Sequence, residues 1–224
     1  MNTVIELKNI GKSFGGKQIY RDVNLEVNAG ECIGFAGRNG AGKSVLFQLM
    51  VGLLPPDSGE VRVNGELLGS GGEDFPKDVG ILINETGFIG YRSGFQNLKM
   101  LAQIRNIVDD ETIRETIRSV GLDDADKIPV RKYSMGMRQK LGIAQAIMEN
   151  QSIVILDEPY NALDFEANRE VTQILERLKG QGKTILLTSH QHQYLEKLCD
   201  KIYFICNGEI VPFTEEIRAQ YFSV

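Results

Sequence analysis

Short apolar runs dominate the first third of the chain. Apolar and polar residues alternate at 5–7, 23–27 and 61–63, which is the pattern of strands with one buried face. The runs 32–36 (CIGFA) and 79–83 (VGILI) are almost entirely apolar and predict strands buried on both faces. This part of the chain is therefore expected to form β-structure.

Turn residues separate these predicted strands. Asn64-Gly65 predicts a tight two-residue hairpin turn, and the run 55–59 (PPDSG) predicts a loop. A glycine-rich loop follows residue 36, and after it the apolar positions between 45 and 50 have helical spacing. The order strand, glycine-rich loop, helix is the first feature that indicates a ligand.

The pattern becomes helical between about residues 94 and 150. Helices are expected around 98–104, from 109 to 121 and after Gly136, and acidic residues at 109–111 favour a helix N-terminus there. Beyond 150, apolar strands at 153–156, 184–188 and 202–205 alternate with helices at 168–179 and 194–198. Asn207-Gly208 then turns the last strand, and a short helix ends the chain. This alternation predicts an α/β fold with a mostly parallel sheet covered on both faces.

Composition narrows the class of protein. The chain has 224 residues, 42% of them hydrophobic, which suffices for one domain with a large core. Its 25 basic and 30 acidic residues give a net charge of −5, so no nucleic-acid partner is expected. No apolar run approaches the roughly 18 residues of a membrane span, and Glu6 and Lys8 occupy the stretch that an export signal would make apolar. Cys32, Cys199 and Cys206 lack metal-binding spacing and are expected to be buried, reduced thiols in a cytosolic protein.

The glycine-rich loop has the form G-x-x-x-x-G-K-S. It consists of Gly37, Arg38, Asn39, Gly40, Ala41, Gly42, Lys43 and Ser44. Glycines let successive backbone N–H groups turn towards phosphate oxygens, and the following helix N-terminus favours negative charge. Lys43 is expected to neutralise the β- and γ-phosphates, and the Ser44 hydroxyl to hold Mg²⁺. The loop therefore predicts binding of a nucleoside triphosphate.

A second motif ends the apolar strand at 153–156. Asp157 and Glu158 follow that strand directly, at the carboxyl edge of the sheet where ligands bind in such folds. Asp157 is expected to act on Mg²⁺ through water, and Glu158 to orient and polarise the attacking water. The alternative is a strand that ends in two solvated acids. Beside the phosphate loop, the pair predicts hydrolysis of the nucleotide.

Residues 133–139 (YSMGMRQ) stand just before this strand. The run resembles the LSGGQ-type signature of the ATP-binding cassette family, in a form frequent in its exporters. Ser134 and Gly136 would present donors from a helix N-terminus to a γ-phosphate. The resemblance implies a single ATPase domain over 1–224. Its core would be that of a P-loop NTPase with a mostly parallel sheet and an N-terminal antiparallel β-subdomain (1–93 and 151–224), and a helical insertion at 94–150 would carry the signature.

Other landmarks of that family occur in order. Residues 161–164 (NALD) resemble the loop after the second motif, and His190 resembles the histidine that contacts the γ-phosphate. Phe14 resembles the aromatic residue that stacks on adenine, with ordinary strand packing as the alternative. Asn84 stands where the family usually has a Gln that meets Mg²⁺ and the transport subunit. Asn is one methylene shorter, and Glu85 is its possible substitute.

The resemblance also implies partners. Two cassettes, either two copies or one copy and a second ATPase subunit, would sandwich ATP head to tail, with Ser134 and Gly136 of one closing over the phosphate loop of the other. A separate integral membrane permease would hold the chain at the cytoplasmic face of the membrane. The segment 84–95, with Phe88 and Tyr91, is the expected contact for that permease. The alternative is that its aromatic residues pack the hinge of the helical subdomain.

Three functions remain open from the sequence. The ATPase subunit of an exporter, with ATP and Mg²⁺ as cofactors, fits all the motifs. A soluble cassette ATPase that serves an assembly process, such as iron–sulfur cluster biogenesis, fits the same motifs without a membrane partner. A P-loop kinase of a small metabolite would need no signature peptide.

Overall fold

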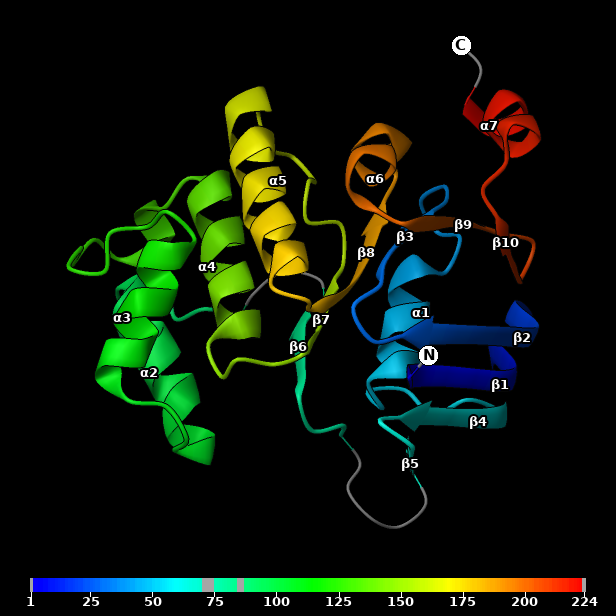
Figure 1. The fold of residues 1–224 in the computed structure, drawn as a ribbon, viewed down its shortest axis with the longest axis horizontal. Coiled ribbons are helices and arrows are strands. Elements are labelled where there is room, and N and C mark those ends of the chain that lie inside the picture. The colour runs from blue at the N-terminus through cyan, green and yellow to red at the C-terminus, as the bar shows by residue number, and fades with distance from the viewer. Residues whose placement is uncertain (1, 70–74, 84–86, 223–224) are drawn as a thin grey trace.

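The computed structural model describes residues 2–69, 75–83 and 87–222, which build two β-sheets with helices packed around them (Figure 1). The larger sheet has six strands. Their spatial order is β10 (Glu209–Pro212), β9 (Lys201–Cys206), β3 (Cys32–Ala36), β8 (Thr184–Ser189), β7 (Ile153–Leu156) and β6 (Val79–Leu82). Every neighbouring pair is parallel except β10–β9, so the predicted mostly parallel sheet is confirmed.

The order of the strands places β8 between β3 and β7. The strand that leads into the phosphate loop is therefore not adjacent to the strand that carries Asp157 and Glu158. The parallel register aligns Ala36 with Ser189 and Leu156 with Leu187, so the three carboxyl ends meet at one edge of the sheet. Ligands of such sheets bind at this edge.

The smaller sheet is antiparallel and has the order β2 (Lys17–Asn28), β1 (Thr3–Phe14), β4 (Ser58–Val63) and β5 (Glu66–Leu67). The predicted turn at Asn64-Gly65 is confirmed, since both residues have positive φ, at 50° and 81°, as this hairpin turn requires. The predicted loop at 55–59 was wrong in its last two residues. Ser58 and Gly59 already belong to β4, because Ser58 pairs with Gly11 of β1.

The helices are α1 (Lys43–Met50), α2 (Gly94–Arg105), α3 (Asp110–Ser119), α4 (Met135–Ile147), α5 (Phe165–Gly180), α6 (His192–Leu198) and α7 (Glu215–Phe222), with a 3₁₀ turn η1 (Val130–Lys132). Side-chain caps fix several of the starts. Ser93, Asp109, Ser134 and Asp164 each accept a backbone N–H from the first turn of the helix that follows. The cap at Asp164 explains why α5 begins three residues earlier than its apolar spacing predicted. Within the described part of the chain, no helix combines the length and the apolar character that crossing a membrane requires.

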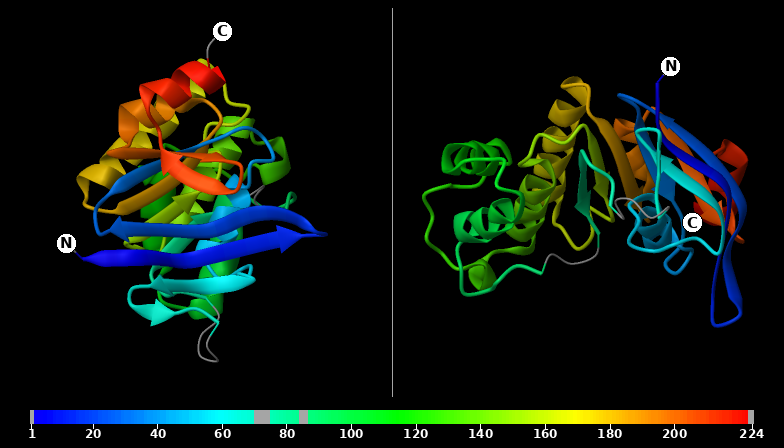
Figure 2. Two further views of the ribbon diagram at one scale, coloured as in Figure 1. Left: turned by 90° about the vertical axis from the view of Figure 1, so that its right-hand side faces the viewer. Right: turned by 90° about the horizontal axis from the view of Figure 1, so that it is seen from below.

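Helices lie on one face of the large sheet, and α1 with the small sheet lies on the other (Figure 2). Each face carries one apolar core. Along β7 the side chains alternate between them. Val154 and Leu156 belong to the core completed by α2–α6, whereas Ile153 and Ile155 belong to the core shared with α1 and the small sheet. On β6, a Cβ added at Gly80 would collide with the Ala146 carbonyl oxygen, so α4 packs directly on the strand backbone. The core completed by α2–α6 contains residues from both sides of positions 94 and 150. The expected subdomain boundaries at these positions stay a prediction.

The three cysteines are free thiols, as expected. Cys32 is fully buried at the start of β3, and its Sγ lies 3.8 Å from Cys199 Sγ at the end of α6. Cys199 and Cys206 are only half-buried, so the expectation of buried thiols was wrong for these two. Each stands at the end of an element, where the covering layer is incomplete.

Candidate functional site

The phosphate loop joins β3 to α1 at the carboxyl edge of the large sheet. Gly37 is buried, whereas Arg38, Asn39 and Gly40 are exposed. Gly40 and Gly42 have positive φ values of 80° and 109°, a conformation that residues with a Cβ rarely adopt. No side chain caps the start of α1, and its first turn holds no acidic residue. The helix therefore offers uncapped N–H groups and a positive dipole end to an anion.

Lys43 lies at the centre of this loop. Its side chain is 7% exposed, and its Nζ donates to the Gly37 carbonyl at 2.8 Å and to the Arg38 carbonyl at 3.3 Å. The same Nζ lies 3.0 Å from Glu158 Oε1, an ion pair without the alignment of a hydrogen bond. The loop thus holds its cation against the carboxylate that the second motif provides.

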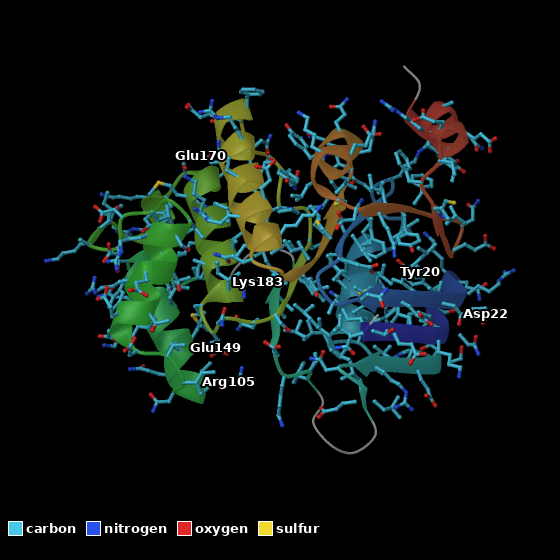
Figure 3. The ribbon with its side chains drawn as sticks, in the orientation of Figure 1. Tyr20, Asp22, Arg105, Glu149, Glu170 and Lys183 are labelled. Atoms are coloured by element: carbon cyan, nitrogen blue, oxygen red, sulfur yellow. The ribbon has the colours of Figure 1, made fainter. Side chains whose placement is uncertain are left out.

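Tyr20 supports the loop from behind, and the sequence analysis did not identify it. Its ring is fully buried on β2, and its hydroxyl donates to the Gly42 carbonyl at 2.8 Å (Figure 3). A Cβ at Gly42 would lie 2.9 Å from Ile19 and 3.0 Å from the Tyr20 hydroxyl, so the loop fits closely against this strand. Burial raises the pKa of Tyr20 far above its ordinary value, and the phenol remains a hydrogen-bond donor. The predicted strand covered only 23–27, and Tyr20 lies in the part of β2 that this prediction left out.

Thr188 connects the two acids of the second motif. Its hydroxyl donates to Asp157 Oδ1 at 2.6 Å and accepts the Glu158 backbone N–H at 2.7 Å. Thr188 is fully buried and Asp157 is 8% exposed, so water has little access to either bond. Glu158 has a positive φ of 49°, a costly conformation for a residue with a long side chain. The position of β8 between β3 and β7 places Thr188 there.

His190 follows β8 and contacts Glu158 rather than the loop. Its Nδ1 lies 2.9 Å from Glu158 Oε2, and its backbone N–H donates to the same oxygen at 3.2 Å. Lys43, at the start of α1, and His190, directly after β8, therefore contact the two different oxygens of one carboxylate. The structure brings the three residues together, and the predicted contact of His190 with a γ-phosphate stays a prediction.

A pocket of about 270 Å³ opens beside these residues. It is lined by Ile19, Asn39, Gly40, Gly42, Lys43, Ser44, Val45 and Glu158. Its wall combines loop N–H groups, one cation and one carboxylate over an apolar floor. This is a fitting surface for a phosphorylated ligand.

The donors expected for Mg²⁺ are only partly described. Ser44 lies at the start of α1, and Asp157 keeps its second oxygen free of Thr188. In the part of the chain that the structure describes, no group of three or more His, Cys, Asp or Glu is arranged to hold a metal. Mg²⁺ is commonly held by one or two protein oxygens together with water and nucleotide phosphates, so this donor set fits it. Asn84, the third expected donor, and Glu85 lie outside the described residues.

Phe14 ends β1 and is 45% exposed, which agrees with a surface that receives a flat ligand. Lys12 Nζ lies 5.4 Å from the centre of its ring and donates to Asp57 Oδ1 at 2.7 Å. The Ser13 N–H donates to the other Asp57 oxygen at 2.7 Å. The Lys12 ammonium and this backbone bond hold the pKa of Asp57 below its usual range. The strand end that carries Phe14 is therefore anchored, while stacking on adenine stays a prediction.

The signature residues lie away from the pocket. Ser134 is exposed and caps α4, where its hydroxyl accepts the Met137 N–H at 3.1 Å. A Cβ at Gly136 would lie 3.0 Å from Ala167 Cβ, so a glycine lets α5 approach α4 closely. The Lys140–Glu170 ion pair, at 2.6 Å, joins the two helices further along. Neither Ser134 nor Gly136 lines the described pocket at the phosphate loop.

The expected permease segment is described from residue 87 onward. Phe88 and Phe95 are half-buried and pack against the core of the helical region. The Arg114 guanidinium lies 4.2 Å from the centre of the Phe95 ring. Tyr91, in contrast, is 73% exposed. The segment thus holds both packed and exposed aromatic residues, and the two interpretations of it stay open.

A family model described as ABC transporter matches residues 20–161. The lantibiotic transport ATP-binding protein SrtF of Streptococcus pyogenes is 34% identical over 93% of this chain and 89% of its own length. The bacitracin transport ATP-binding protein BcrA of Bacillus licheniformis is 33% identical over 95% of this chain and 71% of its own length. A solved structure described as the ATP-binding subunit of an ABC transporter superposes with a TM-score of 0.83 at 26% identity, covering 98% of this chain and 93% of that one.

Proposed function

The chain belongs to the ABC transporter family of ATP-binding proteins, and on this basis we propose that it powers the export of a substrate through a separate membrane permease. The observation that carries the proposal is the contact of Lys43 and His190 with the two carboxylate oxygens of Glu158, at the rim of the phosphate-loop pocket. This arrangement fits hydrolysis of a bound nucleoside triphosphate.

Each residue of the site has a role in that reaction. The amides of Gly40 to Ser44 and the Lys43 ammonium bind the phosphates of ATP. Glu158 accepts a proton from the attacking water, and His190 holds its carboxylate in place. Phe14 supplies a surface for the adenine ring. Ser44 and Asp157 would hold Mg²⁺, and the ion would neutralise charge on the phosphates.

The site calls for a second cassette. Ser134 and Gly136 present a helix N-terminus that the described pocket of the same chain does not use. Head-to-tail association of two cassettes would bring that helix to the γ-phosphate held by the partner. ATP then favours the closed dimer because it binds that state better than separate chains, and hydrolysis removes the bridging phosphate. In this proposal the helical region 94–150 acts as the subdomain that carries the signature.

The names of the relatives indicate the purpose of the cycle. SrtF and BcrA are described as ATP-binding proteins of lantibiotic and bacitracin transport. We infer that this chain serves an export system for a peptide antibiotic or a similar compound. It would act at the cytoplasmic face of the membrane, with the exposed Tyr91 as part of the permease contact.

The first test uses Glu158→Gln. The amide keeps the shape of the side chain but does not accept the proton, so hydrolysis should fall at least about a hundredfold. With saturating ATP and Mg²⁺, the variant should elute in size-exclusion chromatography at twice the protomer mass. Lys43→Ala is the matched control and should stay monomeric, because it loses the phosphate contact. A Glu158→Gln protein that remains monomeric with ATP would refute the dimer.

The second test addresses the partner. Tagged protein is purified from detergent-solubilised membranes of the source cell, and the co-purifying proteins are identified. Recovery of a polytopic membrane protein that is lost in Tyr91→Asp would support the transporter. Recovery of soluble assembly proteins alone would refute it in favour of an assembly ATPase.

A further inference from the structure

A pair of stacked tyrosines lies behind the candidate site. The rings of Tyr160 and Tyr194 are nearly parallel, at 17°, and their centres are 4.5 Å apart. Tyr160 is 1% exposed and Tyr194 is half-buried. Stacking at this separation stabilises the contact beyond what burial of the two rings contributes. The contact therefore holds together the two segments that carry the tyrosines.

The two tyrosines belong to the segments that carry Glu158 and His190. Tyr160 lies two residues after Glu158, in the loop that leaves β7, and Tyr194 lies four residues after His190, on α6. At the front, the Glu158 carboxylate accepts from the His190 backbone and meets its ring. The same two segments are therefore joined twice, once by the contact of Glu158 with His190 and once by the stacked tyrosines.

Asn168 of α5 joins the pair to a third element. Its Nδ2 donates to the Tyr194 hydroxyl oxygen at 3.0 Å and lies 3.4 Å from the Leu163 carbonyl, in the loop before α5. Thr172 donates to the Asn168 carbonyl at 2.9 Å, and its Oγ1 lies 3.4 Å from the Tyr160 hydroxyl. We name Tyr160, Tyr194 and Asn168 the tyrosine clamp.

Asn168 carries one unsatisfied polar atom. The residue is 5% exposed, and its Oδ1 is buried without a hydrogen-bond partner among the described residues. A buried unpaired carbonyl costs free energy that an apolar side chain would avoid. Together with the strained φ of Glu158, this arrangement fits a role in holding the loops rather than in folding alone.

We propose that the tyrosine clamp positions Glu158 against His190 and so sets the rate of hydrolysis without contacting the nucleotide. The inference rests on the proposed ATPase function. The clamp residues act through Glu158 and His190. Tyr160 is two residues from Glu158, Tyr194 is four residues from His190, and Asn168 bonds the second tyrosine. The Gly37 and Arg38 carbonyls also hold Lys43, and these belong to the phosphate loop rather than to the clamp.

The test compares Tyr194→Leu with Tyr194→Phe. Leu removes the stacked ring, and we expect kcat at saturating ATP to fall about ten- to a hundredfold, the effect of a small misplacement of a catalytic group. The Kd for ATP should stay within about twofold, since the phosphate loop is unchanged. Phe keeps the ring and should retain most of kcat. A rise in Kd with unchanged kcat would overturn the proposal.

A double-mutant cycle separates positioning from general damage. In a His190→Ala background the clamp has no histidine to position, so Tyr194→Leu should lower the residual kcat by less than about twofold. An equal loss of kcat in both backgrounds would overturn the inference. Leu178→Ala, at the far end of α5, is the control for lost packing. It should lower the melting temperature with kcat unchanged.

Two further measurements keep the outcome clear. Asn168→Leu removes the amide that donates to Tyr194 and Leu163, so its kcat should fall as in Tyr194→Leu while its Kd for ATP stays within about twofold. Hydrogen exchange of the His190 amide should become faster in Tyr194→Leu, with the phosphate loop unchanged, and this readout needs no hydrolysis. Unchanged exchange would refute the clamp. Lack of ATPase activity in the wild-type chain would refute the proposed function instead.

Discussion

Replacing Thr188 by Val tests how tertiary structure builds the site. The two side chains have nearly the same shape, so Val fills the same space in β8 and keeps the propensity of a strand residue. What the substitution removes is one hydroxyl, which donates to Asp157 Oδ1 at 2.6 Å and accepts the Glu158 N–H at 2.7 Å. No other contact of the threonine needs to change.

The expected cost follows from those two bonds. A buried hydrogen bond to a carboxylate is worth about 1.5–3 kcal/mol, and a neutral one about 1 kcal/mol. Thr188 is fully buried and Asp157 is 8% exposed, so water does not readily replace the hydroxyl. We therefore expect Thr188→Val to lose about 2–4 kcal/mol of unfolding free energy, a large share of the roughly 5–15 kcal/mol of a typical domain.

The assay is urea unfolding of the nucleotide-free protein at pH 7, followed by circular dichroism. Thr188→Ser is the matched control, because it keeps the hydroxyl and loses one methyl group, at about 1 kcal/mol. The unfolding free energy should be highest for the wild type, lower for Thr188→Ser and lowest for Thr188→Val. Its slope against urea concentration should be similar for all three proteins. A Val variant within about 0.5 kcal/mol of the wild type would refute the reasoning, since ordinary surface substitutions do no more. It would mean that the hydroxyl does not hold the two acids together.

Three further predictions concern other parts of the structure. Tyr20→Phe removes the hydroxyl that supports the phosphate loop, so the KM for ATP should rise about three- to tenfold with unchanged kcat, the effect of one buried hydrogen bond. A fall in kcat at constant KM would contradict this role. Gly80→Ala drives a Cβ into the Ala146 carbonyl oxygen, so the melting temperature should fall by more than about 5 °C. A melting temperature within about 2 °C of the wild-type value would show that α4 can move away from β6 at little cost. The Lys12 ammonium holds the pKa of Asp57 below its ordinary value, so the stability from this contact is present above about pH 4 and is lost as the pH falls through the lowered pKa. Carboxylates titrate between about pH 2 and 5. Over this range, the urea concentration at the unfolding midpoint should therefore depend less on pH in Asp57→Asn than in the wild type.

The position of the phosphate loop between a strand and a helix was predictable because its geometry is local. Strand, glycines, lysine and helix follow one another within a dozen residues, and φ preferences and helix-end chemistry act over that distance. Asp157 and Glu158 were predictable for the same reason, since a buried strand delivers whatever follows it to the carboxyl edge. Lys43 and Glu158 are accordingly found where the motifs placed them.

The boundaries of elements were less predictable. α5 begins at Phe165 because the Asp164 side chain caps it, although the apolar spacing starts only at 168. β1 continues to Phe14 because its polar residues pair with β2 across the whole length of the hairpin, and apolar alternation does not report that pairing. In both cases hydrogen bonds extend the element beyond its buried face.

The sequence by itself determined the fold class, the phosphate loop and the pair of acids, because periodicity and short motifs encode local geometry. Only the tertiary structure decided the strand order that inserts β8 between β3 and β7. That order makes Thr188 the bridge between Asp157 and Glu158, and it sets His190 beside the carboxylate. Packing of the small sheet, in the core that it shares with α1, brings Tyr20 of β2 to the phosphate loop. Parallel neighbours are joined by long crossovers, so their choice depends on packing across the whole domain, which no local pattern records.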